Sequence, residues 1–343
     1  MTYAIMLCPR HRRVYLESAG AMALCEISYL CEYAINIREE NIGGLPYIVF
    51  EGELSAENIR LLSRLSFSYA LFEIRSDLLK PIERDCGYFI HEDISSILKY
   101  SGKTSEIFTR LMLNLALTHY STDNIKLLDP MAGKGTTLYE GLMQNSDVYG
   151  IEIDPKPAYE SFVYIKKHLE MARYKHNSHQ EKVSGIDSSG KKFSATRYTA
   201  QIADSKENMK SGQTITFEMI AGDTRHTRAF YKKGTFHAIV GDLPYGVQHG
   251  AKSKPQSQGQ SRNAMGLLQE AMPGWMQVLK PGGAIVLAWN LFLIKREEME
   301  RLFIDNGLTV KDRGLDFSHR LDQATHRDLI VGVKPKIASL RLQ

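Results

Sequence analysis

From about residue 125 onward, apolar residues form short continuous runs, separated by stretches with helical spacing. The runs have the length of strands, and apolar residues recur every three or four positions between them. The predicted strands are Ile125–Asp129, Val148–Ile153, Thr214–Ile220, Phe236–Gly241 and Ala284–Trp289, and the predicted helices lie at about 134–144, 155–172, 263–279 and 295–306. Strands that alternate with helices are typical of an open parallel sheet with helices on both faces.

The end of the chain departs from this alternation. The last two predicted strands, roughly Leu308–Asp312 and Arg327–Lys334, lie too close for a long helix between them, so we expect an antiparallel edge hairpin. With the five earlier strands they predict an α/β fold with a mostly parallel seven-stranded sheet and an antiparallel edge strand. Two polar stretches interrupt the pattern: 176–212 predicts an inserted hairpin or a mobile excursion, and Gly246–Ser261 predicts a loop.

The first hundred residues predict a separate, smaller α/β unit. Its predicted strands are Tyr33–Ile37, Leu45–Phe50 and Ser68–Ile74, and its helix Ala56–Leu65 follows Ser55 as N-cap. A broad apolar face over about 104–117 predicts another helix. We therefore expect a small N-terminal domain at 1–95, a linker helix at 96–122 and a larger domain at 123–343 with an insertion at about 176–212.

Composition and charge narrow the class of protein. Apolar residues make up 43% of the chain and charged residues 24%, and no run approaches the roughly 18 apolar residues of a membrane span. The four cysteines lack the spacing of a zinc site, and the N-terminal charge pattern is the reverse of a signal peptide, so we expect a cytoplasmic protein without a metal. Residues 1–100 carry 10 Lys and Arg against 14 Asp and Glu, whereas 101–343 carry 33 against 25. A polyanion would be attracted first to the second part.

The first candidate site follows the strand Ile125–Asp129. Asp129 ends this strand, and Gly133 and Gly135 let a ligand approach the backbone where a helix begins with unpaired N–H groups. The carboxylate suits an amino group better than a pyrophosphate, which disfavours NAD, and no G-x-x-x-x-G-K-[ST] motif supports a P-loop nucleotidase. A plain tight turn is the alternative interpretation.

Further acids follow the next two strands. Glu152 ends the second strand, where a carboxylate can accept both ribose hydroxyls, and Asp154 comes two residues later. Asp223 and Thr224 follow the third strand, where Asp223 can accept a hydrogen bond from the amine of adenine. Each acid alone is more often a solvated carboxylate. Together they would lie along one crevice, because parallel strands end at the same edge of a sheet.

The fourth strand leads into Asp242-Leu243-Pro244-Tyr245-Gly246. Asp242 can accept a hydrogen bond from an amine, and Tyr245 offers a flat face on which a base can stack. Pro244 stiffens the turn between them. The alternative interpretation is a strand-ending turn with a half-buried tyrosine.

These motifs resemble the class I S-adenosylmethionine-dependent methyltransferases, in the branch that methylates exocyclic amines of bases and carries [D/N/S]-P-P-[Y/F] after the fourth strand. Leu243 in place of the first Pro, Gly246, and the segments Val247–Ala251 and Phe108–Ala116 are similar to the tRNA guanosine-N2 methyltransferases of archaea and eukaryotes. The resemblance covers roughly residues 95–335. It implies a Rossmann-like fold for the larger domain and an RNA-binding or accessory role for the smaller one.

The resemblance also implies a role for each motif. The residues that would bind S-adenosylmethionine are Asp129, Met131, Gly133, Gly135, Thr136, Thr137, Glu152, Asp154, Asp223 and Thr224. The catalytic residues would be Asp242, Leu243, Pro244 and Tyr245. Asp242 and the Leu243 carbonyl would hold the target amine, with Tyr245 stacked on the base. The substrate would be the N2 amine of guanosine in tRNA or another structured RNA. Related enzymes can carry a small activator subunit, and the oligomeric state stays open.

Two other functions stay open. A DNA methyltransferase that acts on adenine N6 or cytosine N4 would use the same motif, although 176–212 is small for a target-recognition domain. A non-catalytic RNA-binding protein would retain the fold without the reaction. We expect no membrane partner.

Overall fold

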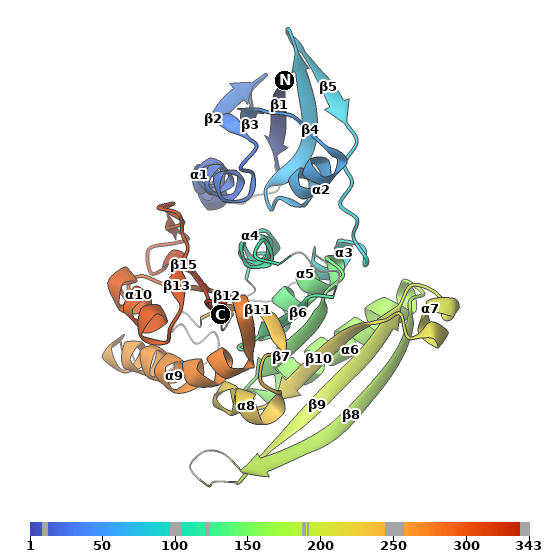
Figure 1. Ribbon diagram of the computed structural model, residues 1–343, viewed down its shortest axis with the longest axis vertical. Helices are drawn as coiled ribbons and strands as arrows, with labels where there is room; N and C mark the ends of the chain where they lie inside the picture. The colour runs from blue at the N-terminus through green and yellow to red at the C-terminus, as the bar shows by residue number, and fades with distance from the viewer. Residues whose placement is uncertain are drawn as a thin grey trace, which may run out of the picture.

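The computed structural model describes residues 1–8, 13–96, 104–120, 124–186, 190, 192–243 and 257–336. Two β-sheets organise these residues, the first from strands between Thr2 and Ile82 and the second from strands between Lys126 and Val333. Figure 1 shows the first sheet above the second, with helix α4 (Glu106–Leu117) between them.

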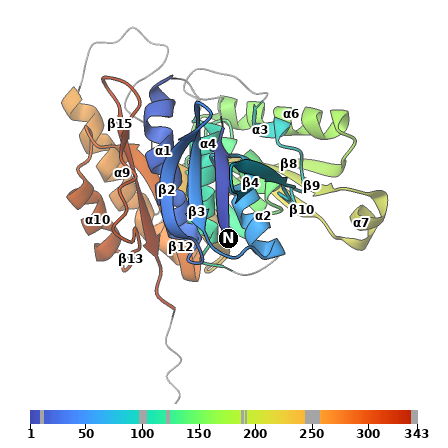
Figure 2. The same ribbon diagram turned by 90° about the horizontal axis from the view of Figure 1, so that it is seen from above.

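The first sheet is antiparallel throughout, in the order β2-β3-β1-β4-β5. Its strands are β1 (Thr2–Leu7), β2 (Ile35–Ile42), β3 (Leu45–Glu51), β4 (Ser68–Arg75) and β5 (Leu78–Ile82). Helices α1 (Arg13–Leu30) and α2 (Ala56–Arg64) lie between this sheet and α4, and Figure 2 shows the strands lying over α4. Ser55 caps α2 as predicted, because its side chain accepts the backbone N–H of Asn58 at 3.1 Å.

The sequence pattern missed β1, α1 and β5. Helix α1 contacts both the first sheet and α4, and its residues Met22, Ile27 and Tyr29 are buried. A helix covered on more than one side has no single apolar stripe, which is the signal that sequence analysis uses. The predicted strand Tyr33–Ile37 begins at Ile35 and continues to Ile42, beyond the predicted end.

The second sheet is mixed and has ten strands. Its order is β13-β15-β12-β11-β6-β7-β10-β9-β8, with β14 also paired to β15. The run β12-β11-β6-β7-β10 is parallel, as predicted, and β15 and β9 flank it in antiparallel pairing. The strands are β6 (Lys126–Asp129), β7 (Asp147–Glu152), β8 (Lys175–Ile186), β9 (Lys192–Ala203), β10 (Ile215–Ala221), β11 (Phe236–Asp242), β12 (Leu279–Asn290), β13 (Thr309–Val310), β14 (His319–Arg320) and β15 (His326–Val333).

Helices cover both faces of the central parallel strands, so each strand is buried on both sides. Successive side chains along a strand therefore pack into two different cores. Leu127 and Val240 pack into the core shared with α4 and α5, whereas Leu128 and Ile239 pack into the core under α9 and α10. The remaining helices are α3 (Asp93–Ser96), α5 (Thr136–Met143), α6 (Pro155–Met171), α7 (Lys206–Ser211), the short 3-10 helix η1 (Thr224–His226), α8 (Thr227–Phe230), α9 (Ser257–Val278) and α10 (Arg296–Asp305). Among the described residues, no helix is long and apolar enough to cross a membrane.

The last two predicted strands form the expected antiparallel pair at the edge of the sheet, with β13 outside β15 and β14 also paired to β15. Two other predictions need correction. The sheet has ten strands rather than seven, because the stretch 176–212 takes the hairpin form of its two predicted forms, its strands β8 and β9 continue the sheet beyond β10, and β14 adds a short pair. The predicted loop Gly246–Ser261 overlaps α9, which begins at Ser257, and residues 244–256 lie outside the described part.

Candidate active site

Four carboxylates follow four neighbouring parallel strands. Asp242 ends β11, Asp129 ends β6, Glu152 ends β7, and Asp223 comes two residues after β10. These strands are adjacent in the order β11-β6-β7-β10. Since neighbouring strands are about 4.8 Å apart, the acids form a row along one edge of the sheet. The second sheet therefore brings together the four acids that the sequence singled out.

Asp129 is the buried member of this row, with 3% of its surface exposed. Its Oδ1 accepts the backbone N–H of Met131 at 3.0 Å. Burial raises the pKa of Asp129 to about 7; the negative charges of Asp242 and Glu152 add to the rise, and hydrogen bonds from Thr137 and Met131 oppose it. Near neutral pH this carboxyl group is therefore poised between its two protonation states, and a cation beside it would favour the charged one.

The turn after Asp129 has the conformation that its glycines allow. Gly133 and Gly135 have φ angles of 53° and 88°, in the region that other residues avoid. A Cβ at Gly135 would lie 2.7 Å from Ser161 Oγ, whereas a Cβ at Gly133 would meet no atom within 4 Å. Gly135 is the N-cap of α5, whose first residues, Thr136 and Thr137, are buried. The backbone at Gly133 thus stays open on one side, which is a surface that a ligand can approach.

Glu152 is held in place by two backbone N–H groups. Its Oε2 accepts from Gly133 and its Oε1 from Asp154, both at 2.9 Å. Burial raises the pKa of Glu152, and these hydrogen bonds oppose the rise. A carboxylate oxygen has two lone-pair directions, so each oxygen keeps capacity for a ligand hydroxyl. Asp154 is exposed and caps α6, where its side chain accepts the N–H of Lys156 at 2.9 Å.

Asp223 faces a guanidinium group that the sequence analysis did not assign to the site. Arg225 binds both carboxylate oxygens of Asp223 and also reaches Glu270 at 2.9 Å. Burial would raise the pKa of Asp223, but the hydrogen bonds from Arg225 outweigh it and the pKa is lowered. Thr224 points into the core, where its hydroxyl accepts the indole N–H of Trp275 at 3.0 Å.

Asp242 contacts two residues that are distant in sequence. Its Oδ2 accepts the hydroxyl of Thr104 at 2.8 Å and lies 3.5 Å from Nη2 of Arg327. The Arg327 side chain is 3% exposed and its guanidinium lies 4.4 Å from the ring centroid of Phe108. Leu243 is buried, and its N–H donates to the Ala288 carbonyl at 2.9 Å. The remaining predicted catalytic residues, Pro244 and Tyr245, lie outside the described residues.

Sequence analysis missed Thr104, Arg225 and Arg327. The signal for Arg327 was present, because a charged residue at the start of an apolar strand must find a partner if it is buried. Its partner was not visible, because Asp242 lies 85 positions away in the chain. Within the described part of the chain, no group of three or more His, Cys, Asp or Glu residues forms a metal site.

Residues 100–288 match the UPF0020 family, described as the RMKL-like methyltransferase domain. This chain belongs to the UPF0020 family. The match covers the helix α4 and the whole row of acids, so the row lies in a methyltransferase domain. The resemblance drawn from the Asp242 motif is thereby confirmed at the level of the family.

Part of this chain is also similar to part of a curated relative. It is 28% identical over 140 residues to the tRNA (guanine(6)-N2)-methyltransferase of Methanocaldococcus jannaschii. The matched region covers 38% of this chain and 32% of the relative, so the chain spans about a third of the length of the curated relative that it matches.

Two solved structures are similar at low sequence identity. TrmN from Thermus thermophilus is 15% identical with a TM-score of 0.38, over 87% of this chain and 59% of TrmN. Precorrin 8W decarboxylase from Methanobacterium thermoautotrophicum is 18% identical with a TM-score of 0.37, over 67% of this chain and 91% of that protein.

Proposed function

We propose that this protein transfers a methyl group from S-adenosylmethionine to the exocyclic N2 amine of a guanosine in tRNA. The observation that carries the proposal is the position of Asp242. Its carboxylate ends β11 beside Asp129 on β6, inside a methyltransferase domain, and Thr104 and Arg327 hold its Oδ2. A fixed carboxylate at this position is suited to accept a hydrogen bond from an amine.

The row of acids fits S-adenosylmethionine, which carries an ammonium and a sulfonium charge. Asp129 is difficult to ionise because it is buried near Asp242 and Glu152, and a cation placed beside it would relieve that repulsion. The open side of Gly133 leaves room for a ligand against the backbone. An anionic ligand would be repelled by this row of carboxylates, whereas a cation or a neutral hydrogen-bond donor would be attracted.

Different residues would bind the methionine, ribose and adenine parts of the cofactor. Asp129 and the backbone of Met131, Gly133 and Gly135 would hold the methionine part at the start of α5, where Thr136 and Thr137 shape the turn. Glu152 would accept the ribose hydroxyls, with Asp154 next to it. Asp223 and the backbone at Thr224 would face the adenine, and Arg225 keeps the Asp223 carboxylate charged and oriented.

When bound, the cofactor supplies an electrophilic methyl group. The N2 amine of guanine is a poor nucleophile, because its lone pair is delocalised into the ring. Hydrogen bonds from this amine to Asp242 and to the Leu243 carbonyl would localise the lone pair, and Asp242 is placed to take the proton that the amine releases. Pro244 and Tyr245 would complete the pocket, with the base stacked on the tyrosine after it has left its helix.

RNA is favoured over DNA by the curated relative, which is named as a tRNA methyltransferase. Residues 101–343 carry 33 Lys and Arg against 25 Asp and Glu, which suits a polyanion of either kind. We also propose that the reaction takes place in the cytoplasm and that the protein has a small activator subunit, like that of related enzymes, which co-purification would test.

The test is to incubate the protein with labelled S-adenosylmethionine and either unmodified tRNA transcripts or duplex DNA, and then to digest the products to nucleosides. We expect label in N2-methylguanosine from tRNA. Label confined to N6-methyladenine or N4-methylcytosine of DNA would replace this proposal with the DNA methyltransferase. Tight cofactor binding without transfer to either polymer would support the non-catalytic alternative.

A further inference from the structure

The hairpin β8–β9 reaches beyond the edge of the sheet on which the acids lie. Ala221, the last residue of β10, pairs with Thr196 of β9, and Thr196 pairs with Lys182 of β8. The segments 183–186 and 192–195 therefore continue past the end of β10. Four residues of strand extend about 13 Å at roughly 3.3 Å per residue. We call these two segments, together with Lys182, the hairpin tip.

The base of the hairpin tip is anchored to the residues around Asp223. The ring of Phe193 stacks on His226 with centroids 4.4 Å apart and planes 18° apart. A Cβ added at Gly222 would lie 3.1 Å from Cβ of Ala195, so the two backbones are in close contact. The hairpin tip is thus held at a defined position beside Asp223, the acid at the end of the row that would face the adenine.

The outer surface of the hairpin is polar and basic. Residues 175–203 contain five Lys and Arg against two Asp and Glu. Lys182, Ser184 and Ile186 lie on one face of β8, and Lys192 of β9 lies opposite Ile186 on the same face, because facing residues of an antiparallel pair share a face. Lys182 and Lys192 are both exposed, and β8 is an edge strand whose outer N–H groups face solvent.

We propose that the hairpin tip docks on the sugar–phosphate backbone of the substrate RNA, next to the nucleotide that enters the site. This inference rests on the proposed RNA methyltransferase function. Four strand spacings separate β9 from β11, the strand that ends in Asp242, so the hairpin tip lies about 19 Å from that strand across the sheet. This distance is within reach of the RNA helix that flanks an extruded base. Lysines and hydroxyl groups suit phosphate and ribose contacts.

A protein partner fits this surface less well. Protein interfaces have an apolar core and are depleted in lysine. On the exposed hairpin tip the large apolar side chain is Ile186, which is 63% exposed, and its neighbours are lysines and serines. Lysine on an edge strand can also serve to prevent pairing with another chain. Replacing lysine by glutamate keeps that protection, so it separates the two roles.

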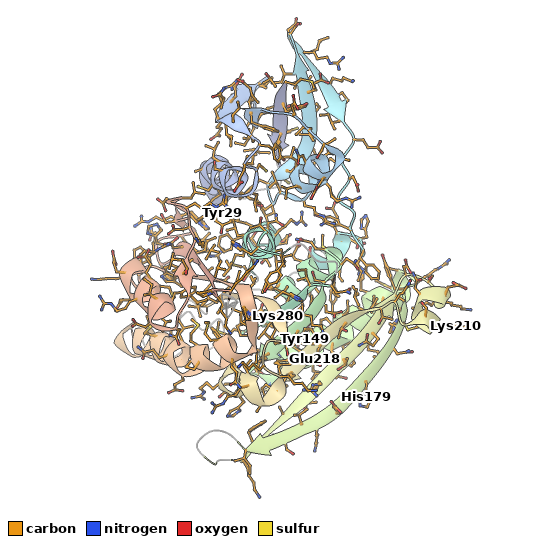
Figure 3. All side chains as sticks on the ribbon, viewed as in Figure 1. Tyr29, Tyr149, His179, Lys210, Glu218 and Lys280 are labelled. Atoms are coloured by element: carbon orange, nitrogen blue, oxygen red, sulfur yellow. The ribbon has the colours of Figure 1, made fainter. Side chains whose placement is uncertain are left out.

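The test compares two charge-reversed variants of the full chain. The variant K182E/K192E alters the hairpin tip, and K206E/K210E makes the same charge change on α7, at the other end of the hairpin, where both lysines are also exposed. Figure 3 labels Lys210 on α7 and His179 midway along β8. Binding of an unmodified tRNA transcript is measured by fluorescence anisotropy at several salt concentrations, and cofactor binding is measured by calorimetry.

We expect K182E/K192E to bind tRNA about tenfold or more weakly than the unaltered protein, with a salt dependence that is shallower by about 1.5 in slope, because two phosphate contacts are lost. K206E/K210E should change binding much less, and both variants should bind the cofactor normally. Equal tRNA affinity and equal salt slope for the two variants would overturn the docking role.

Nucleoside analysis of the unaltered protein separates this result from the proposed function. If it forms N2-methylguanosine while K182E/K192E binds tRNA normally, the docking inference fails and the function stands. If the unaltered protein binds tRNA through Lys182 and Lys192 yet forms no N2-methylguanosine, the docking site stands and the proposed reaction fails.

Discussion

At the residue scale, Asp129 combines burial, hydrogen bonds from Met131 and Thr137, and two nearby carboxylates. Burial raises its pKa to about 7, so below that pH the free protein holds a proton on this side chain. An ammonium group prefers the ionised form, and therefore the proton must leave when the cofactor binds. Cofactor affinity should therefore rise with pH and level off above about pH 7.

We predict that the dissociation constant of S-adenosylmethionine rises about tenfold for each pH unit below 7, between pH 7 and about 5.5. Calorimetry over this range measures it, and the cofactor's own ammonium stays charged throughout. The variant Asp129→Asn should bind weakly with little pH dependence. The same steep profile in that variant would remove Asp129 from the ammonium site.

A second residue-scale prediction concerns Asp242 and Arg327. Asp242→Asn should lower kcat by about 10²–10³, because a group aimed at the transition state is lost, and cofactor affinity should change little. If Arg327 acts by positioning Asp242, Arg327→Gln should lower kcat in the unaltered protein but have a much smaller effect when Asp242 is already Asn. Arg327→Lys should restore part of the rate. Independent, additive effects on kcat would show that Arg327 does not act through Asp242.

At the element scale, α4 joins the methyltransferase sheet to the N-terminal unit. Arg110 on α4 binds Glu140 on α5, with Nε and Oε2 2.9 Å apart, and the two side chains are 11% and 0% exposed. Residues 108–116 of α4 are all buried, so the helix has no solvated face in this stretch. Thr104, just before the helix, carries the contact to Asp242. Packing of α4 therefore also supports the position of a site residue.

We predict that Glu140→Gln lowers the free energy of unfolding by about 3–5 kcal/mol, because it leaves the buried guanidinium without its counter-charge. Urea denaturation measures the change. Asp85→Asn is the matched control, because Asp85 pairs with Arg60 at 2.8 Å but both side chains are more than half exposed. The control should cost less than about 1 kcal/mol. Equal losses in the two variants would contradict the assigned role of burial.

At the scale of the whole molecule, a buried polar network connects the two sheets. Glu26 on α1 is fully buried; it accepts the N–H of Ser66 at 3.0 Å and the Asn114 side-chain amide on α4 at 2.7 Å. Gln144, which follows α5, donates to Asn114 at 3.3 Å. We propose that residues 1–95 form a module that docks on the methyltransferase domain through this network.

Asn114→Ala should therefore destabilise the protein by about 1–3 kcal/mol, because the Glu26 carboxylate loses a hydrogen bond where water cannot replace it. Asn177→Ala on exposed β8 is the control and should stay within about 0.5 kcal/mol. Thermal and urea unfolding of both variants measure the difference. A loss at Asn114 no larger than at Asn177 would argue against docking through this network.

The sequence by itself determined the five parallel strands and the acids that follow them. Strands covered on both faces require apolar runs, and an acid directly after such a run is visible without knowledge of the fold. Asp129, Glu152, Asp223 and Asp242 could be assigned to one edge for that reason. Helix α1 could not be predicted in the same way, since it is buried on more than one side and lacks a single apolar stripe.

Only the tertiary structure decided which of these groups are neighbours. The order β11-β6-β7-β10 places Asp242 beside Asp129, although 113 positions separate them in the chain, and the pairing of β15 with β12 brings Arg327 to Asp242. It also decided that the polar stretch 176–212, for which the sequence left a hairpin or a mobile excursion open, forms the hairpin β8–β9 and continues the sheet. Local periodicity records how one segment is buried, whereas these arrangements depend on pairing between distant segments, for which a single sequence carries no local signal.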